Sequence, residues 1–334
     1  MTPICQTFID HPAAWTAREL GSRRALERPL KQAELDDLAR LLDETAGKAP
    51  QAVTRDDVRQ PALVALLDEL RETLMRGRGA VLLTGLDPAR HDPEQLERIY
   101  WALGTHLGEA AVQSHAGDRL GRVERDDKDP VARGYRSAGE LVMHTDSYEV
   151  VGLQCIRSAA HGGQSALVSS LAIHNALLRE HPDLLPALYE GYYLAIPEAR
   201  LGSKPVTDEK IPVFCCVDGQ VSCMYAGSFM REAARQKGTP LPGRLAEALE
   251  AFSRAAERED LALRFMLAPG EILLWHNFTN LHSRTEFEDD EQHRRLLLRL
   301  WLTVPQGRPV APEFGVRGAA YARVYRERLS SGAA

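Results

Sequence analysis

The sequence has few cysteines and few aromatic residues, and it has no long run of apolar residues. Only five of its 334 residues are cysteines, and no two of them form a CxxC pair. An odd number without that spacing does not indicate a disulfide framework, so we expect a reduced, cytoplasmic protein. No apolar stretch has the length of a membrane span, and the N-terminus lacks the basic and apolar regions of a signal peptide. We therefore expect no association with a membrane.

The charge of the chain is balanced and slightly acidic. The formal net charge is −6, with 26% charged and 44% hydrophobic residues, which is the composition of an ordinary globular protein. An acidic chain has no general attraction for nucleic acid or for an anionic surface. We expect a small-molecule substrate as the partner, and a homo-oligomer stays an open alternative.

The spacing of apolar residues changes from helical to strand-like along the chain. Helices are predicted at 30–48, 57–76, 93–107, 171–179, 182–189 and 241–258. Strands are predicted at 77–85, 141–143, 150–156, 165–169, 192–196, 211–217, 221–225, 263–267, 271–275 and 296–304. A polar loop is expected at 126–133.

The order of these elements predicts one domain over 1–334, because no repeat, linker or break in composition divides the chain. Its N-terminal part, about 1–76, is expected to be helical. A strand-rich core should follow over about 77–310, with a helical insertion at about 171–258.

His144 and Asp146 are the most informative pair of residues. Residues i and i+2 of a strand point to the same face, so these two side chains can bind one ion together. His282, on a distant strand, would add a third ligand. Two histidines and one carboxylate leave metal positions open, and they are the usual environment of non-haem Fe(II) in oxygenases. His276 is a rival for the third position, and we favour His282.

Arg295 and Arg299 lie in a strand that is otherwise made of leucine and tryptophan. Two arginines on one face beside bulky apolar neighbours predict an inward pocket that binds carboxylates. An exposed strand with salt bridges to Asp289 and its acidic neighbours is the alternative. Ser165 follows a glycine turn, and its hydroxyl could donate to a bound carboxylate.

Taken together, these residues resemble the TauD/TfdA (taurine dioxygenase, clavaminate-synthase-like) family of Fe(II)- and 2-oxoglutarate-dependent oxygenases. The resemblance covers roughly residues 75–310. It rests on His144-Thr-Asp146, Gly162-Gly163-Gln-Ser165, Trp275-His-Asn277 through His282-Ser-Arg284, and Arg295-Leu-Leu-Leu-Arg299. It implies an α+β fold with a double-stranded β-helix (jelly roll) flanked by helices.

The resemblance also implies the cofactors and their ligands. Fe(II) would be bound by His144, Asp146 and His282, with 2-oxoglutarate and O2 as cosubstrates. Arg295 would pair with the distal carboxylate of 2-oxoglutarate, and Ser165 stands where the family often has a threonine that contacts it.

Other positions of the family pattern concern the substrate. Arg299 and Gln113 fall where some members of the family contact substrate. The chain departs from the pattern at His276, where the family usually has aspartate, and at Ser283, where glycine is common. Halogenating relatives lack the metal carboxylate, so the presence of Asp146 disfavours halogenation.

The expected reaction is hydroxylation of an unactivated C–H bond in a small molecule, such as an amino acid or another acid of secondary metabolism. Desaturation or cyclisation with the same cofactors stays open. A metal-dependent hydrolase and an inactive binding module on the same barrel are alternatives of another class. The substrate pocket is expected to involve the N-terminal segment, residues 111–137 and the loop near 197–212.

Overall fold

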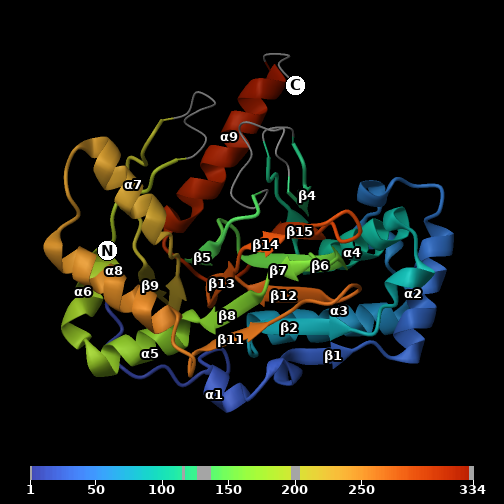
Figure 1. Ribbon diagram of the computed structural model, residues 1–334, viewed down its shortest axis with the longest axis horizontal. Coiled ribbons are helices and arrows are strands. Elements are labelled where there is room, and N and C mark those ends of the chain that lie inside the picture. The colour runs from blue at the N-terminus through green and yellow to red at the C-terminus, as the bar shows by residue number, and fades with distance from the viewer. Residues whose placement is uncertain (1, 115–116, 126–136, 197–203, 331–334) are drawn as a thin grey trace.

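Two β-sheets form the centre of the protein, and helices lie outside them (Figure 1). The computed structural model describes residues 2–114, 117–125, 137–196 and 204–330. The larger sheet has the order β1-β2-β12-β6-β15-β3, with β4 also paired to β15, and the smaller sheet has the order β11-β8-β13-β5. The strands of the larger sheet are β1 (Glu27–Pro29), β2 (Ala80–Thr84), β3 (Glu109–Ala110), β4 (Leu120–Val123), β6 (Val150–Arg157), β12 (Ile272–His276) and β15 (Leu296–Thr303). Those of the smaller sheet are β5 (Leu141–His144), β8 (Ser165–Ser169), β11 (Ala262–Phe265) and β13 (Asn280–Arg284).

The helices gather in two groups at opposite ends of the molecule (Figure 1). One group is α2 (Gln32–Glu44), α3 (Pro61–Met75) and α4 (Pro93–Leu107). The other is α5 (Ser170–Glu180), α6 (Leu185–Glu190), α7 (Gly227–Lys237) and α8 (Gly243–Ala256), which surround the hairpin of β9 (Phe214–Val217) and β10 (Gln220–Cys223). The short α1 (Ala17–Leu20) lies below the sheets, and α9 (Val316–Ser330) extends away from the body.

The alternation of side chains along each strand separates two cores. In β2, Val81 and Leu83 join the apolar cluster that contains α2, α3 and α4. Ala80 and Leu82 face the other way, into a cluster with Leu167 of the smaller sheet. The two sheets therefore pack face to face through this second cluster, which also contains Trp275 and Trp301.

The mixed architecture and most of the expected elements are confirmed. The helices predicted at 30–48, 57–76, 93–107 and 241–258 are α2, α3, α4 and α8, and the strands predicted around His144 and Arg299 are β5 and β15. Among the described strands, the two sheets share no strand and do not close into one barrel. The single-domain prediction stays a prediction.

One predicted strand is wrong, and the helices α1, α7 and α9 were missed. Residues 192–196 form only isolated bridges, from Tyr192 to Ile211 and from Ala195 to Val206. The Leu194 N–H donates to the Thr207 hydroxyl at 3.0 Å instead of to a neighbouring strand. The helix α9 was missed because its apolar residues form no clear stripe at helical spacing among its charged residues. The loop expected at 126–133 lies outside the described residues.

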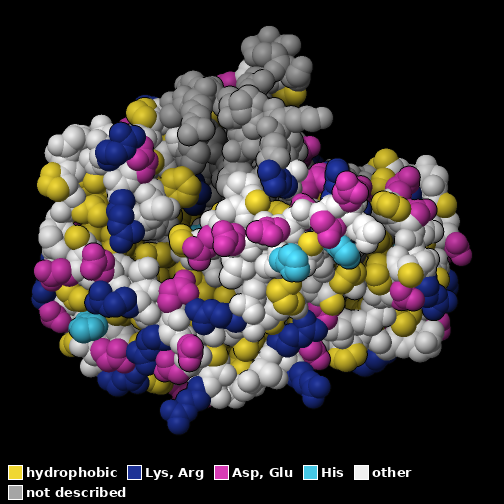
Figure 2. Space-filling view, in the orientation of Figure 1, with side chains coloured by type: hydrophobic (Ala, Val, Ile, Leu, Met, Phe, Trp, Pro, Cys, Tyr) yellow, Lys and Arg dark blue, Asp and Glu magenta, His cyan; other side chains and the backbone are white. Residues whose placement is uncertain are grey.

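The surface in Figure 2 mixes acidic and basic side chains over the described residues, without a broad field of one sign. This agrees with the net charge of −6. None of the helices in the described part of the chain combines the length and the hydrophobicity that a bilayer crossing requires.

Candidate active site

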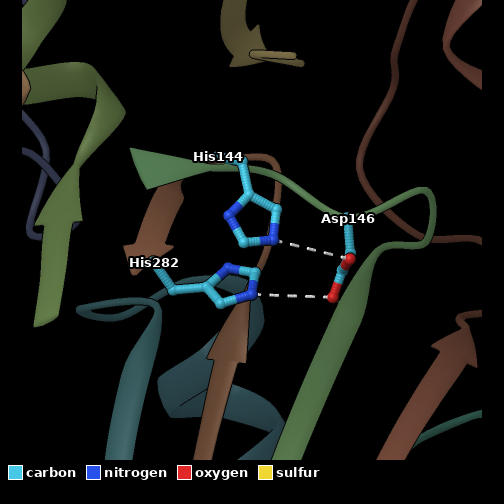
Figure 3. A group of neighbouring side chains, drawn as sticks. All are labelled: His144, Asp146 and His282. Atoms are coloured by element: carbon cyan, nitrogen blue, oxygen red, sulfur yellow. Dashed lines mark ion pairs between the residues drawn. The ribbon is translucent and has the colours of Figure 1, made fainter. Parts of the chain in front are cut away.

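His144, Asp146 and His282 come together at the edge of the smaller sheet where β5 pairs with β13 (Figure 3). His282 on β13 lies directly opposite His144 on β5 in the antiparallel register. The His144 Nε2 atom lies 3.9 Å from Asp146 Oδ1, and the His282 Nε2 atom lies 3.6 Å from Asp146 Oδ2. One ligand atom from each residue falls within 4.8 Å of the others. The three side chains can therefore surround a single ion.

Asp146 reaches this site from a loop, so its prediction as a strand neighbour of His144 is wrong. The strand β5 ends at His144. The next residue, Thr145, exchanges hydrogen bonds with Tyr225: the Thr145 N–H donates to the Tyr225 carbonyl, and the Tyr225 N–H donates to the Thr145 hydroxyl, both at 2.9 Å. These bonds turn the chain away from β13 before it reaches Asp146.

Asn277 fixes the turned segment. Its side-chain oxygen accepts from the Asp146 N–H at 3.0 Å. Its side-chain amide donates to the carbonyls of Asp146 at 3.0 Å and Tyr148 at 2.8 Å. Asn277 is fully buried at the turn between β12 and β13, so it ties the loop of one metal ligand to the hairpin that carries another.

The site favours the ionisation states that a divalent cation requires. Burial alone would raise the pKa of Asp146, but the charge of Arg299 and the neighbouring histidines holds it well below its usual range. Burial lowers the pKa of His144, and burial together with the charge of His144 lowers the pKa of His282 to about 3. A carboxylate and two neutral imidazoles are the forms that bind a metal.

The tautomer of His144 follows from a backbone contact. Its Nδ1–H donates to the Val142 carbonyl at 2.8 Å. This bond leaves the Nε2 lone pair for the ion, as is usual for metal-binding histidines. The ring of His282 packs against His144, with centroids 4.2 Å apart, and against Trp275, at 4.7 Å.

Trp301 orients the metal carboxylate from the larger sheet. Its indole N–H donates to Asp146 Oδ2 at 2.7 Å. The Arg299 guanidinium lies over the Trp301 ring, 4.1 Å from its centroid. Trp301 was not predicted as a site residue, although it stands two positions after Arg299 and therefore shares its face of β15.

Gln113 holds Arg299 in this position. The Arg299 Nε–H donates to the Gln113 side-chain oxygen at 2.8 Å. The Gln113 amide donates to the carbonyls of Arg119 and Arg299, both at 2.8 Å. Gln113 is fully buried, and its side chain bonds to these two arginines, so the structure places it behind Arg299.

Arg295 lies in a different corner from Arg299. It precedes β15, and the register of β15 against β6 shifts between Leu296 and Leu297. Arg295 therefore lies outside the strand, so the alternation expected from Arg295 to Arg299 does not extend to Arg295, and the extra residue at the register shift, Ile156, belongs to β6. Both arginines are buried, which argues against an exposed strand. Arg295 lies over the ring of Phe287, at 5.0 Å from its centroid.

The glycine turn and Ser165 lie beside Arg295. A side chain at Gly163 would place its Cβ 3.2 Å from Arg295 Nε, and the backbone of Gly163 has a φ of +74°. The positive φ favours glycine here, and a side chain would also crowd the Arg295 guanidinium. Ser165 begins β8 and is buried.

His276 is not part of the triad. It is almost completely buried, and its Nε2 atom lies 3.2 Å from Glu149 Oε1. Glu149 also accepts from the Arg308 N–H at 2.5 Å. His276 thus connects β12 to the segments around Glu149 and Arg308, a contact that the sequence did not reveal because Glu149 has no motif of its own.

The family model of the taurine catabolism dioxygenase TauD, TfdA family matches residues 40–301, which include the triad and both arginines. The chain belongs to this family. The resemblance seen in the sequence is confirmed, and so is the class of non-haem iron dioxygenase with Fe(II), 2-oxoglutarate and O2. The His-Asp-His set with neutral imidazoles fits Fe(II).

Two characterised relatives show the breadth of the family. The chain is 30% identical to FR-33289 synthase of Streptomyces rubellomurinus over 253 residues, which are 73% of this chain and 74% of the relative. It is 27% identical to the taurine hydroxylase-like protein SAT17 of Stachybotrys chartarum over 317 residues, which are 87% of this chain and 79% of the relative.

Solved structures of two oxygenases share the fold. Asparagine oxygenase, in complex with Fe(II), 3-hydroxyasparagine and succinate, has a TM-score of 0.65 at 18% identity and covers 83% of this chain and 93% of its own. The non-haem iron oxygenase OrfP, in complex with Fe and α-ketoglutaric acid, has a TM-score of 0.63 at 16% identity and covers 87% and 99%.

Replacement of Trp301 by phenylalanine should weaken Fe(II) binding about tenfold to a hundredfold, which is typical for loss of a group that orients a metal ligand. The change removes the hydrogen bond to Asp146 and keeps an aromatic ring. Trp275→Phe is the matched control, because the Trp275 indole N–H is buried without a partner among the described residues. Equal Fe(II) affinity of the two variants, measured by anaerobic titration, would contradict the assigned role of Trp301.

Proposed function

We propose that this dioxygenase hydroxylates a C–H bond of a small acidic molecule, such as an amino acid. The observation that carries the proposal is a His-Asp-His set around a buried aspartate, with two separate buried arginines nearby. Arg295 would bind a carboxylate of the cosubstrate, and Arg299 would bind an acidic group of the substrate. The two facing sheets are then the two faces of the jelly roll that the family pattern implies.

The residues of the triad hold the metal on one side only. His144, Asp146 and His282 would bind Fe(II) and leave its other positions open for ligands. Iron and 2-oxoglutarate, when bound, supply the oxidising chemistry that uses O2. The protein positions the reactants and keeps water from them, and the neighbouring Trp275 and Trp301 give the triad an apolar wall.

Arg295 and Ser165 would bind the distal carboxylate of 2-oxoglutarate. Arg295 is buried next to the glycine turn that precedes Ser165, so its guanidinium can offer a charged contact in a site with little water. A binding group buried at this end orients the other end of the molecule toward the metal.

Arg299 would bind an acidic group of the substrate, and Gln113 would hold Arg299 in place. The charge of Arg299 is the main influence that lowers the pKa of Asp146 against the effect of burial, so its guanidinium lies near the triad. The names of the relatives support an acidic substrate. Asparagine oxygenase and OrfP were solved with hydroxylated amino acids, and a further relative is a uridine-5'-phosphate dioxygenase of Streptomyces.

The same cofactors could also support a reaction other than hydroxylation. Desaturation or cyclisation would use the same residues. A metal-dependent hydrolase or an inactive binding module is less favoured, because neither gives a role to a buried Arg295. A cytoplasmic location, a homo-oligomeric state and the single domain stay predictions.

The test is an anaerobic titration of metal-free protein with Fe(II) and then with 2-oxoglutarate. We expect the weak visible absorption band of a 2-oxo acid chelated to Fe(II), and its loss in His144→Ala. Aerobic incubation with amino acids and phosphorylated small molecules should then give succinate and a product heavier by one oxygen atom. Fe(II) binding without the band would contradict the role of 2-oxoglutarate and favour a hydrolase.

A further inference from the structure

Two buried arginines share one corner of the protein. Arg284 ends β13, and Arg295 stands just before β15, and each is only 5% exposed. Their guanidinium carbons lie 4.8 Å and 5.0 Å from the centroid of the same ring, that of Phe287. Arg295 belongs to the proposed cosubstrate site, but Arg284 has no role in the function described so far.

Arg284 is held rigidly by backbone carbonyl groups. Its Nε–H donates to the Thr285 carbonyl at 3.2 Å, and its Nη2 donates to the carbonyls of Ser137, at 3.0 Å, and Gly139. Its Nη1 is buried and has no hydrogen-bond partner among the described residues. One edge of the guanidinium is therefore fixed, and the other donor stays available to a ligand.

The guanidinium of Arg295 resembles that of Arg284 in its hydrogen bonding. Its Nη1 is also buried without a hydrogen-bond partner in the described part of the chain. Its backbone N–H, and not its guanidinium, donates to Asp289 at 2.9 Å. Within the described ranges, neither Arg284 nor Arg295 forms an ion pair with a carboxylate.

Burying two positively charged guanidinium groups side by side costs free energy. Burial lowers the pKa of Arg284 to about 10, and burial together with the charge of Arg284 lowers the pKa of Arg295 to about 10. Buried charges in proteins are normally paired, because the loss of hydration must be offset by an opposite charge. An anion that occupies this corner would supply the missing charge and satisfy both Nη1 donors.

The location of Arg284 and Arg295 indicates which anion would bind beside them. Arg284 lies directly opposite Ser165 in the register of β13 and β8. The turn before Ser165 is bonded to the segment after Arg284, since the Gln164 N–H donates to the Thr285 hydroxyl at 2.9 Å. Arg284, Ser165 and Arg295 therefore surround the place at which the distal carboxylate of 2-oxoglutarate is expected.

We propose that Arg284 is a second cationic group for the distal carboxylate, and that the Arg284–Arg295 pair selects dicarboxylic over monocarboxylic 2-oxo acids. This inference rests on the proposed function and names a specificity-determining residue for it. A carboxylate has two oxygens and can accept from both guanidinium groups. Because Arg284 is already fixed by three carbonyls, little side-chain entropy is lost when the carboxylate binds.

The test compares two cosubstrate probes in the Fe(II)-loaded, anaerobic protein. 2-Oxoglutarate and 2-oxopentanoate have the same chain length, but only the first has a distal carboxylate. In Arg284→Gln we expect the Kd of 2-oxoglutarate to rise about tenfold to a hundredfold, the usual effect of losing one charge-assisted hydrogen bond. The Kd of 2-oxopentanoate should change by less than about threefold. Both values come from the visible chelate band.

Two further variants sharpen this comparison. Arg264→Gln changes an exposed arginine of the same sheet, on β11, and should leave the ratio of the two Kd values at that of the wild type. Arg284→Lys keeps the charge and should retain part of the preference for 2-oxoglutarate. Since the ratio is measured within each variant, it does not depend on a general loss of stability, and Arg284→Lys replaces Arg284→Gln if the latter fails to fold.

The outcomes separate this inference from the proposed function. An unchanged ratio in Arg284→Gln, with a band that forms normally, would overturn the role of Arg284 and leave the proposed function intact. An equal loss of both probes would also overturn it, because Arg284 would then only support the fold. If the wild-type protein forms no band with either acid, the proposed function itself fails.

Discussion

Replacement of His282 by alanine is expected to abolish turnover and to weaken Fe(II) binding by more than about a hundredfold. Loss of a group that only orients a metal ligand costs about tenfold to a hundredfold, so loss of a ligand itself should exceed that range. His282 contributes one of the three ligand atoms, and its Nε2 lies 3.6 Å from Asp146. Fe(II) binding is measured anaerobically, and turnover is measured as succinate release. Asp146→Ala should have an equally large effect.

The matched control is His276→Gln. His276 is more deeply buried than His282, stands on the preceding strand and bonds to Glu149, but it lies outside the triad. Glutamine can keep a hydrogen bond to Glu149, so Fe(II) affinity should stay within about threefold of the wild type, since no ligand is lost. Loss of Fe(II) binding in His276→Gln, together with its retention in His282→Ala, would reverse the ligand assignment.

The second large effect is expected for Arg295→Gln, which should raise the Kd of 2-oxoglutarate at least roughly thirtyfold. Removal of one partner from a buried charge pair costs about 2 to 5 kcal/mol, because the remaining charge is left without compensation. The Fe(II) affinity should not change, since Arg295 contacts Phe287 and Gly163 and not the triad. The same anaerobic titration gives both constants.

Arg294→Gln is the control for this effect. Arg294 is the exposed neighbour of Arg295, so the substitution removes the same charge from the surface and not from the pocket. We expect an unchanged Kd for 2-oxoglutarate. Equal losses in the two variants would mean that general electrostatic attraction, and not a contact of Arg295, draws the cosubstrate into the site.

Much of the metal site could be predicted from sequence because ligands are limited to a few residue types with recognisable spacing. His144, Asp146 and His282 were named in advance, and the structure brings them together. The path of the chain between two of them was predicted wrongly. The hydrogen bonds of Thr145 with Tyr225 end the strand, and a contact between residues so far apart leaves no local pattern.

The residues that support the ligands could not be found in the same way. Trp301, Asn277 and Glu149 act through hydrogen bonds to segments distant in sequence. Their residue types have no characteristic spacing, and in isolation each has the ordinary role of packing or turn formation. Arg284 was noticed only as part of a family pattern, and its unfilled Nη1 donor is visible only in three dimensions.

The sequence by itself determined the class of the protein, because the ligand types, their order and the alternation of apolar residues are local properties of the chain. It determined the helices that cover the larger sheet and the strands that carry His144 and His282. Only the tertiary structure decided that Arg295 and Arg299 lie in different corners, since Arg295 stands before β15 over the Phe287 ring, whereas Arg299 lies within β15 over the Trp301 ring. It also decided that Arg284 lies with Ser165 and Arg295, because the pairing of β13 with β8 places Arg284 opposite Ser165, more than a hundred positions away, and both arginines lie over the Phe287 ring.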